Sequence, residues 1–195
     1  MANVDFFELL NRIEQLRRGG DYNGMEIACA ELETLAPPPQ LGARVTYEKA
    51  MAAKEQGKFT EALHWSHLSA SQAQVGGDHI GAWYADAILG AEILPKLGET
   101  PAAIIALRQA LVATAVFAKD VTAADRGRFD NLVMNLNLWF IDLGISDQVI
   151  TVADVELCLK ALRENPVYQK KRAGDPTLFQ AILDKAAKYI DRNQK

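Results

Sequence analysis

The sequence predicts an all-α protein made of three to four antiparallel helix pairs and one further helix that covers the C-terminal end. Two observations predict this class. Apolar residues recur at i, i+3, i+4 and i+7 along most of the chain, which is the period of an amphipathic helix. Glycines and prolines interrupt that pattern, and no segment requires a β-strand. The 195 residues, 49% of them hydrophobic, can bury a continuous core in one domain.

Interruptions divide the N-terminal half into two helix pairs. The first apolar stripe, which starts at Phe6, ends at Gly20, and the second ends before a run of three prolines that begins at Pro37. The next pair is broken at Gly57 and closed at Gly77. The pairs are expected at about 3–36, 41–74, 79–118 and 122–164, and the capping helix at about 176–192.

Boundaries are weaker in the C-terminal half. The helix that opens at Thr100 is apolar almost all the way round, so we expect neighbours to cover it on more than one side. A long helix from about Thr122 carries two apolar stripes. Residues 151–154 resemble a capping box and would open the next helix. Residues 167–174, with three consecutive basic side chains, are expected to form a solvated loop.

An internal repeat connects the pairs. In its clearest copy, residues 43–74, Ala62 lies five residues after the turn glycine and Ala50 lies twelve residues before Ala62. Small side chains at these positions would let the two helices of a pair approach closely. Glycines mark the expected turns, in steps of 37, 41 and 46 residues, at Gly20, Gly57, Gly98 and Gly144.

The turn of this copy carries a family resemblance. Residues 56–62 read Gln-Gly-Lys-Phe-Thr-Glu-Ala, which resembles the turn QGDYDEA of the tetratricopeptide repeat (TPR), a helix-turn-helix unit of about 34 residues. The resemblance covers about residues 1–165, with steps longer than the family's and with weaker matches in the third and fourth pairs. It implies an α-α superhelix, a TPR-like array closed by the C-terminal capping helix.

Such an array has a concave groove lined by the first helix of each pair, so the resemblance also implies a binding site. The groove would be basic toward its N-terminal end and apolar toward its C-terminal end, which suits a peptide or helix with an acidic end and apolar anchors. The alternative is that these positions are simply packed or solvated. The implied groove residues are Arg17, Arg44, Tyr47, Met51, Lys54, Ile88, Glu92, Lys96, Met134, Leu138 and Ile141.

Composition disfavours several kinds of partner. With 21 Lys and Arg against 25 Asp and Glu, the net charge is -4, so we expect no nucleic acid partner. No run of about 18 apolar residues is uninterrupted, so no membrane span is predicted, and the N-terminus lacks the features of a signal peptide. Cys29 and Cys158 lie on apolar stripes and are expected to be buried thiols of a cytoplasmic protein.

Two groups of side chains invite a chemical interpretation. Glu61 and His64 have the Glu-x-x-His spacing of di-iron carboxylate bundles, with His67 and His79 as further donors. No second Glu-x-x-His helix exists, so a surface cluster without metal or cofactor is the preferred interpretation. The basic run 170–172 is expected to be solvated rather than bound to an anionic partner.

The sequence lacks the catalytic motifs for thiol and phosphate chemistry, and its aromatic residues favour a place in the core. Neither cysteine has a recognisable histidine base, and no glycine-rich phosphate loop follows a strand, so we predict no enzyme. Aromatic residues at helical spacing favour a core role over a ligand pocket. They are Trp65, Trp83, Tyr84, Trp139 and Phe140.

The predicted function is a non-enzymatic protein–protein interaction scaffold or adaptor that binds a protein or peptide partner. Two alternatives stay open. One is a chaperone-like holder of a secreted or partially folded client. The other is a self-assembling structural protein, for instance a homodimer, that uses Met134, Leu138 and Ile141 or the exposed part of residues 101–115 as its contact face.

Overall fold

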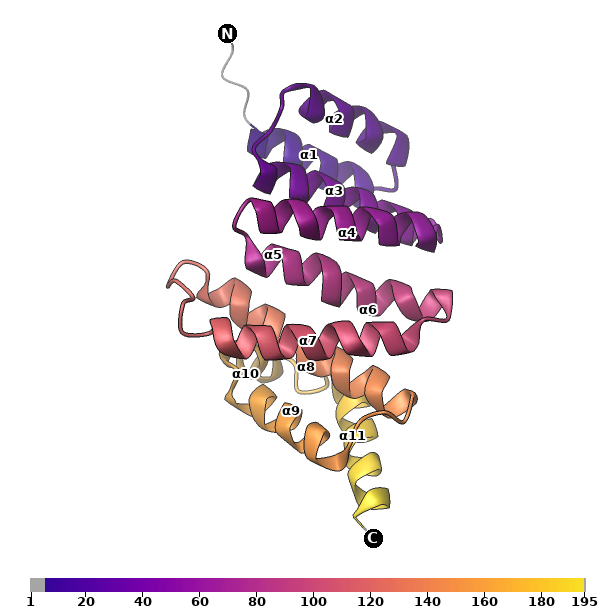
Figure 1. The fold of residues 1–195 in the computed structure, drawn as a ribbon, viewed down its shortest axis with the longest axis vertical. Coiled ribbons are helices and arrows are strands. Elements are labelled where there is room, and N and C mark those ends of the chain that lie inside the picture. Colours follow the sequence, from indigo (N-terminus) through magenta and orange to yellow (C-terminus); the bar gives the residue numbers. More distant parts are fainter. Residues whose placement is uncertain (1–5, 195) are drawn as a thin grey trace. The chain divides into compact units, whose positions relative to one another are not determined.

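The computed structural model describes residues 6–194, and throughout that range the chain forms helices and turns without a β-strand (Figure 1). The all-α prediction is therefore confirmed. The chain divides into two compact units, one that ends at Leu97 and one that begins at Gly98. This boundary lies inside the predicted third pair, 79–118, so the two helices of that pair belong to different units. Each unit is described by itself.

The first unit opens with two helical hairpins, which lie where the first and second pairs are expected; residues 3–5 of the expected first pair lie outside the described residues. Helix α1 packs on α2, α3 packs on α4, and α3 and α4 lie side by side along their length (Figure 1). A continuous helical run of four short segments completes the unit. The bounds are α1 (Phe6–Arg18), α2 (Tyr22–Thr34), α3 (Pro39–Glu55), α4 (Phe59–Val75), α5 (His79–Trp83), η1 (Tyr84–Leu89), α6 (Gly90–Ile93) and η2 (Leu94–Leu97).

Glycines end three of these helices as the sequence predicts. Gly20, Gly57 and Gly77 have φ values of 76°, 74° and 78°, a left-handed conformation that costs a side chain-bearing residue more than glycine. After each of them, the next amide donates to a carbonyl five residues earlier, for example Lys58 N to Ala53 O at 2.9 Å. This is the Schellman arrangement, which satisfies carbonyls at the end of the helix.

Small side chains bring α3 and α4 together. Ala50 and Ala62, the two residues on which the repeat was aligned, are both fully buried in one core cluster with Ala53. Leu89 and Ile93 from the helical run pack on the same cluster. The close contact predicted within residues 43–74 is therefore present.

A π-helical segment interrupts the run that follows. Residues Tyr84–Leu89 form η1, and such a segment replaces the i→i+4 hydrogen bonds of an α-helix with i→i+5 bonds. The fully buried Ser66 of α4 donates its hydroxyl to the carbonyl oxygen of Ala85 at 2.5 Å. A hydroxyl that engages the backbone here is one of the recognised causes of a local change in helix geometry.

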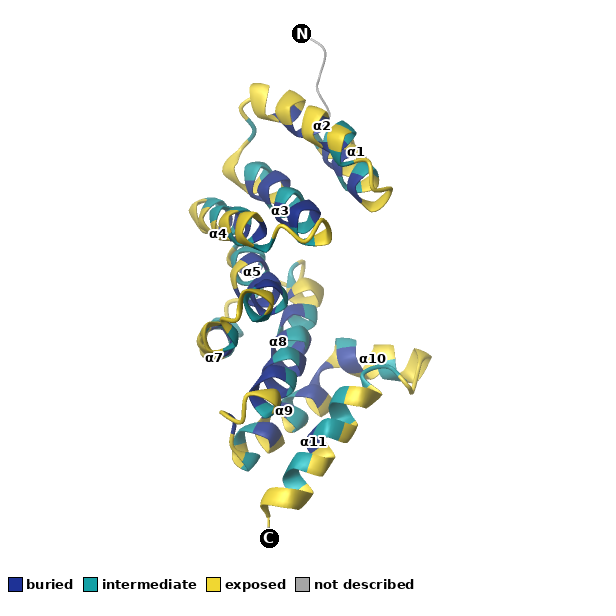
Figure 2. Cartoon of the chain, turned by 90° about the vertical axis from the view of Figure 1, so that its right-hand side faces the viewer, coloured by how far each residue is buried: buried dark blue, intermediate teal, exposed yellow. Residues whose placement is uncertain are grey.

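In the second unit, α8 is the central element. It packs against every other helix of the unit, and Figure 2 shows buried residues along most of its length. Buried side chains on several sides of α8 form the core, among them Phe129, Leu132, Leu136 and Phe140. The bounds are α7 (Thr100–Phe117), α8 (Arg126–Ser146), α9 (Val152–Glu164), α10 (Pro166–Gly174) and α11 (Gln180–Asn193).

Gly144 does not break a pair, which corrects the alignment of the fourth repeat. It is buried inside α8, where a Cβ atom would come within 2.9 Å of the Cβ atom of Ile150. Close packing against Ile150 therefore explains this glycine. The left-handed turn residue is Gln148, with φ 56°, and Val149 N donates to Gly144 O at 3.1 Å as in the other turns.

We expect the substitution Gln148→Gly to raise the free energy of unfolding of the second unit by about 1 kcal/mol, because glycine adopts the left-handed conformation without the steric cost. Urea unfolding of the full chain measures the change. Gln169→Gly is the matched control, since it lies within α10 and is expected to destabilise by about the same amount. Destabilisation by Gln148→Gly would contradict the prediction.

The predicted loop 167–174 is instead a helix, α10. Asn165 accepts a hydrogen bond from Tyr168 N at 2.9 Å and caps this helix, and its amide donates to Asp130 O of α8 at 2.8 Å. Pro166 occupies the first turn, where its missing donor costs nothing. Tyr168 is buried and stacks on Phe179, with ring centroids 5.8 Å apart. The sequence signal for this helix start is Asn165 followed by Pro166, a capping residue and then a proline in the first turn. The last helix, α11, begins at Gln180, four residues later than predicted.

Candidate interaction surfaces

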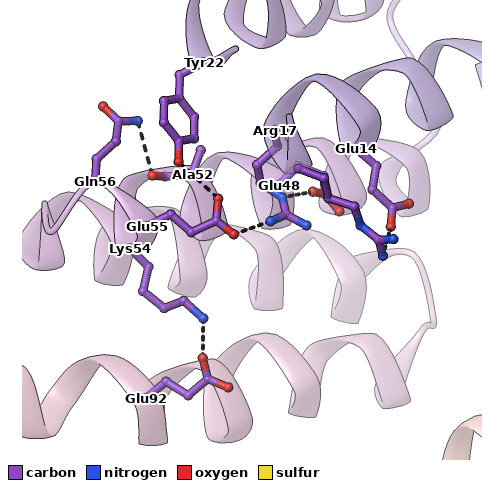
Figure 3. Close-up of polar contacts among 10 residues, drawn as sticks. Glu14, Arg17, Tyr22, Glu48, Ala52, Lys54, Glu55, Gln56 and Glu92 are labelled. Carbon is purple, nitrogen blue, oxygen red and sulfur yellow. Dashed lines mark hydrogen bonds and ion pairs between the residues drawn. The ribbon is translucent and has the colours of Figure 1, made fainter. Parts of the chain in front are cut away.

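Arg17, the first predicted groove residue, lies in an ion-pair network between α1 and α3 (Figure 3). Its Nε atom is 2.6 Å from Glu48 Oε2, and its Nη1 atom pairs with Glu55, which also accepts a hydrogen bond from Tyr22. Only 9% of Arg17 is exposed. Burial lowers the pKa of Arg17, but hydrogen bonds and charges from Glu48 and Glu55 outweigh it and raise the pKa above its usual value. Arg17 therefore joins α1 to α3 and is not a free cation.

Lys54 is neutralised in the same way. Its ammonium group pairs with Glu92 of α6, another predicted groove residue (Figure 3). Tyr47 is half-buried nearby, and burial, with the charges of Glu92 and Glu48, raises the pKa of Tyr47 to about 12. Tyr47 thus keeps its proton at neutral pH. The structure brings these predicted residues together, but in a network whose charges largely cancel.

The remaining predicted groove residues of the first unit differ in how far they are exposed to solvent. Met51 is half-buried, Ile88 is buried, and Arg44 and Lys96 are exposed. Because Arg17 and Lys54 are both paired with carboxylates, the predicted basic end of a groove reduces to Arg44. This corrects the expected charge of that surface. Sequence spacing does not single out Glu48 and Glu55, because their pairing with Arg17 depends on the position of α1 relative to α3.

The predicted apolar anchors of the second unit are not available for binding. Met134 and Ile141 are fully buried and Leu138 is 4% exposed. They lie on the second stripe of α8, which is covered because helices pack around α8 on several sides. This corrects both the apolar end of the groove and the self-assembly face that used the same residues.

The histidines lie on or beside a cavity of about 380 Å³ between α4 and the run that begins with α5. His67 and His79 line it with Trp83 and Asp86, and His67 Nδ1 is 3.2 Å from Asp86 Oδ1. His64 instead packs its edge against Trp65, with centroids 5.3 Å apart. Over residues 6–194, no three His, Cys, Asp or Glu side chains are grouped so that they could hold a metal ion.

Both cysteines are buried, as predicted. Burial raises the pKa of Cys29 to about 11 and that of Cys158 to about 12. Both thiols therefore stay protonated at neutral pH, and a thiol is a much weaker nucleophile than a thiolate.

Helix α7 presents the most apolar exposed face. One side of it, with Ile104 and Leu107 at the centre, is buried, and α7 packs on α8. On its other side Ile105, Val112 and Val116 are 58%, 63% and 67% exposed. The expectation that neighbours cover this helix on more than one side is therefore wrong in this structure.

By length and composition, α7 alone among the described helices could span a membrane. Its mean hydropathy is 1.5, and 28% of the 18 residues are buried. Arg108 stands at its middle, where the guanidinium lies 5.5 Å from the ring centre of Phe140 and 3.8 Å from a carboxylate oxygen of Asp154. The prediction that the chain has no membrane span stays a prediction.

Comparison with family models, with curated proteins and with solved structures finds no match to this chain. The resemblance to the tetratricopeptide repeat therefore stays a prediction that rests on the quoted residues. Among the surfaces described above, the exposed face of α7 carries three large exposed apolar side chains on one side of one helix.

Proposed function

We propose that the protein is a non-enzymatic interaction scaffold and that it binds a helix of a partner protein on the exposed apolar face of α7. The observation that carries the proposal is the exposure of Ile105, Val112 and Val116 along one side of one helix. Several large apolar side chains exposed on one face of a folded protein often mark an interaction site.

The spacing of these residues suits a helical partner. Val112 and Val116 follow Ile105 by seven and eleven residues, so the three side chains form a stripe about 16 Å long at 1.5 Å per residue. Anchors at such intervals are what an amphipathic helix presents to, or receives from, another helix. Gln109 is exposed within the stripe, between Ile105 and Val112, and Arg108 is exposed at its edge, so both can donate hydrogen bonds to a partner.

A protein partner fits this face better than a lipid bilayer. A bilayer-spanning α7 would hold Arg108 at the centre of the hydrocarbon, at a cost of about 2.5–3.5 kcal/mol on insertion scales. A partner helix that lies along the stripe leaves Arg108 at the edge, in its contact with Asp154. The face is also one side of a helix whose opposite side packs on α8.

The TPR-like superhelix belongs to this proposal as the arrangement that the helix pairs would build. The glycine turns at Gly20 and Gly57 and the close contact of Ala50 with Ala62 support it. A cytoplasmic location is proposed with it, because both cysteines are free and buried. A held client or a second copy of this chain on α7 would be special cases of the same binding mode.

The substitution Val112→Asp is expected to weaken partner binding at least tenfold, because a charge would replace a buried side chain at the centre of the interface. The tagged full-length protein is used to capture partners from its native cells, and the affinity of each captured partner is then measured. Sedimentation of the purified protein tests whether the partner is a second copy.

Val75→Asp is the matched control. Val75 is 77% exposed on α4, so it receives the same charge at an equally open apolar position away from α7. Both variants should unfold at nearly the same denaturant concentration as the unmodified protein. Equal capture by the two variants would show that α7 is not the contact surface.

A further inference from the structure

Positive charge is concentrated near the C-terminus of an otherwise acidic chain. Residues 160–195 contain nine Lys and Arg against four Asp and Glu, whereas the whole chain has 21 against 25. Such segregation raises the local concentration of anionic partners at one place on the surface. Three of these cations lie on one helix, α11.

A cavity of about 520 Å³ lies between the end of α8 and α11. Three cations from α11 line it, Lys185, Lys188 and Arg192, and the ring of Tyr189 and the side chain of Ile145 supply apolar walls. Its size is within the range of about 300–1,000 Å³ typical of ligand sites. The cavity therefore combines positive charge with apolar surface.

Only one of the three cations is already used. Lys185 Nζ lies 2.5 Å from Asp142 Oδ1 and donates to Ser146 Oγ at 2.6 Å, so it holds α11 against α8. Lys188 and Arg192 are exposed, and among residues 6–194 neither has a carboxylate within ion-pair distance. Two cations one helical turn apart thus face the cavity without an anion.

We infer that this cavity binds an acidic peptide segment of a protein partner. Side chains at i and i+4 of a helix have Cβ atoms about 5–6 Å apart, so Lys188 and Arg192 match two carboxylates that lie two residues apart in an extended segment, or three or four residues apart in a helical one. The exposed amide of Gln148 can pair with the backbone of such a segment, and Ile145 and Tyr189 can cover its aliphatic side-chain carbons.

Nucleic acid is the less suitable anion. A phosphate backbone is normally bound by a track of cations over several nucleotides. Of the three consecutive cations of α10, Arg172 is engaged with the carbonyl oxygens of Pro176 and Leu178, so the run is not an uninterrupted track. A compact site with two cations and apolar walls fits a short acidic peptide better. This site is on α11, so the result of its test does not depend on whether the face of α7 binds a partner.

The test is an NMR titration of the isotopically labelled full-length protein with a blocked hexa-glutamate peptide, with hexa-glutamine as the neutral comparison. Saturable shifts at Gln148, Tyr189 and Arg192 are expected with hexa-glutamate only. Lys188→Gln with Arg192→Gln should weaken binding about fivefold to tenfold, as expected for two exposed ion pairs. Lys170→Gln with Lys171→Gln, which removes the same charge from α10, should change it less than about twofold.

Three results would overturn the inference. One is absence of saturable shifts around the cavity, and another is equal weakening by both double substitutions, which would indicate general electrostatic attraction. The third is tighter binding of inorganic phosphate or of a single-stranded RNA with the same number of charges. Unchanged thermal unfolding of both double variants confirms that they fold, because the substituted side chains are exposed.

Discussion

Replacement of Arg17 by methionine is expected to lower the free energy of unfolding of the first unit by about 3 kcal/mol, since removal of one partner from a buried ion pair leaves the other charge uncompensated. Glu48 would be the main source of the loss, because only 14% of its side chain is exposed, against 31% for Glu55. Methionine preserves most of the apolar volume, so the effect reports charge rather than packing. Hydrogen exchange of the amides of α1 and α3 measures it.

Arg12→Met is the control for this experiment. Arg12 pairs with Glu31 at 3.4 Å on the surface, with both side chains more than half exposed, and its loss should cost less than about 0.5 kcal/mol. Adding Glu48→Gln to Arg17→Met should recover part of the loss, because the unpaired carboxylate is removed. Equal effects of Arg17→Met and Arg12→Met would show that the network around Arg17 contributes no more than a surface pair.

The second large effect is expected at Ile141. Because this side chain is fully buried on the second stripe of α8, Ile141→Ala should destabilise the second unit by about 3 kcal/mol through lost burial and a residual cavity. Urea unfolding measures the change. Ile105→Ala deletes the same atoms at an exposed position of α7 and should change stability by less than about 0.5 kcal/mol. If Ile141→Ala were equally mild, the second stripe would have to face solvent.

The parts of the fold that sequence predicts are those with local causes. Helix periodicity and the glycine turns at Gly20 and Gly57 involve residues within one or two turns of each other, so the bounds of α1–α4 follow from the sequence with small errors. The capping box is equally local: Thr151 Oγ1 accepts from Asp154 N at 3.1 Å, and Asp154 accepts from Thr151 N at 3.0 Å. That pairing lowers the pKa of Asp154.

The rest depends on contacts between helices that sequence spacing does not specify. Both stripes of α8 are apolar, and only the helices around it decide that Met134 and Ile141 are buried. Arg17 and Lys54 are the residue types expected in a basic groove, but Glu55 and Glu92 neutralise their charges. Each of these glutamates lies 38 residues from its partner in the sequence. Gly144 is a residue type that favours turns, but in the structure it lies inside α8 in close contact with Ile150.

The π-helical segment Tyr84–Leu89 has a consequence for chain length. Its wide turn holds one residue more than the α-helical turn that would span the same rise, so the helix on either side keeps its phase despite the additional residue. A chain shorter by one residue within this segment could continue as a regular α-helix and still place Glu92 opposite Lys54. In a regular α-helix, the insertion or deletion of one residue would rotate Glu92 by about 100° about the helix axis. Within this segment, the change between a π-helical and an α-helical turn compensates for that rotation. Relatives of this protein that differ in length by one residue are expected to differ here.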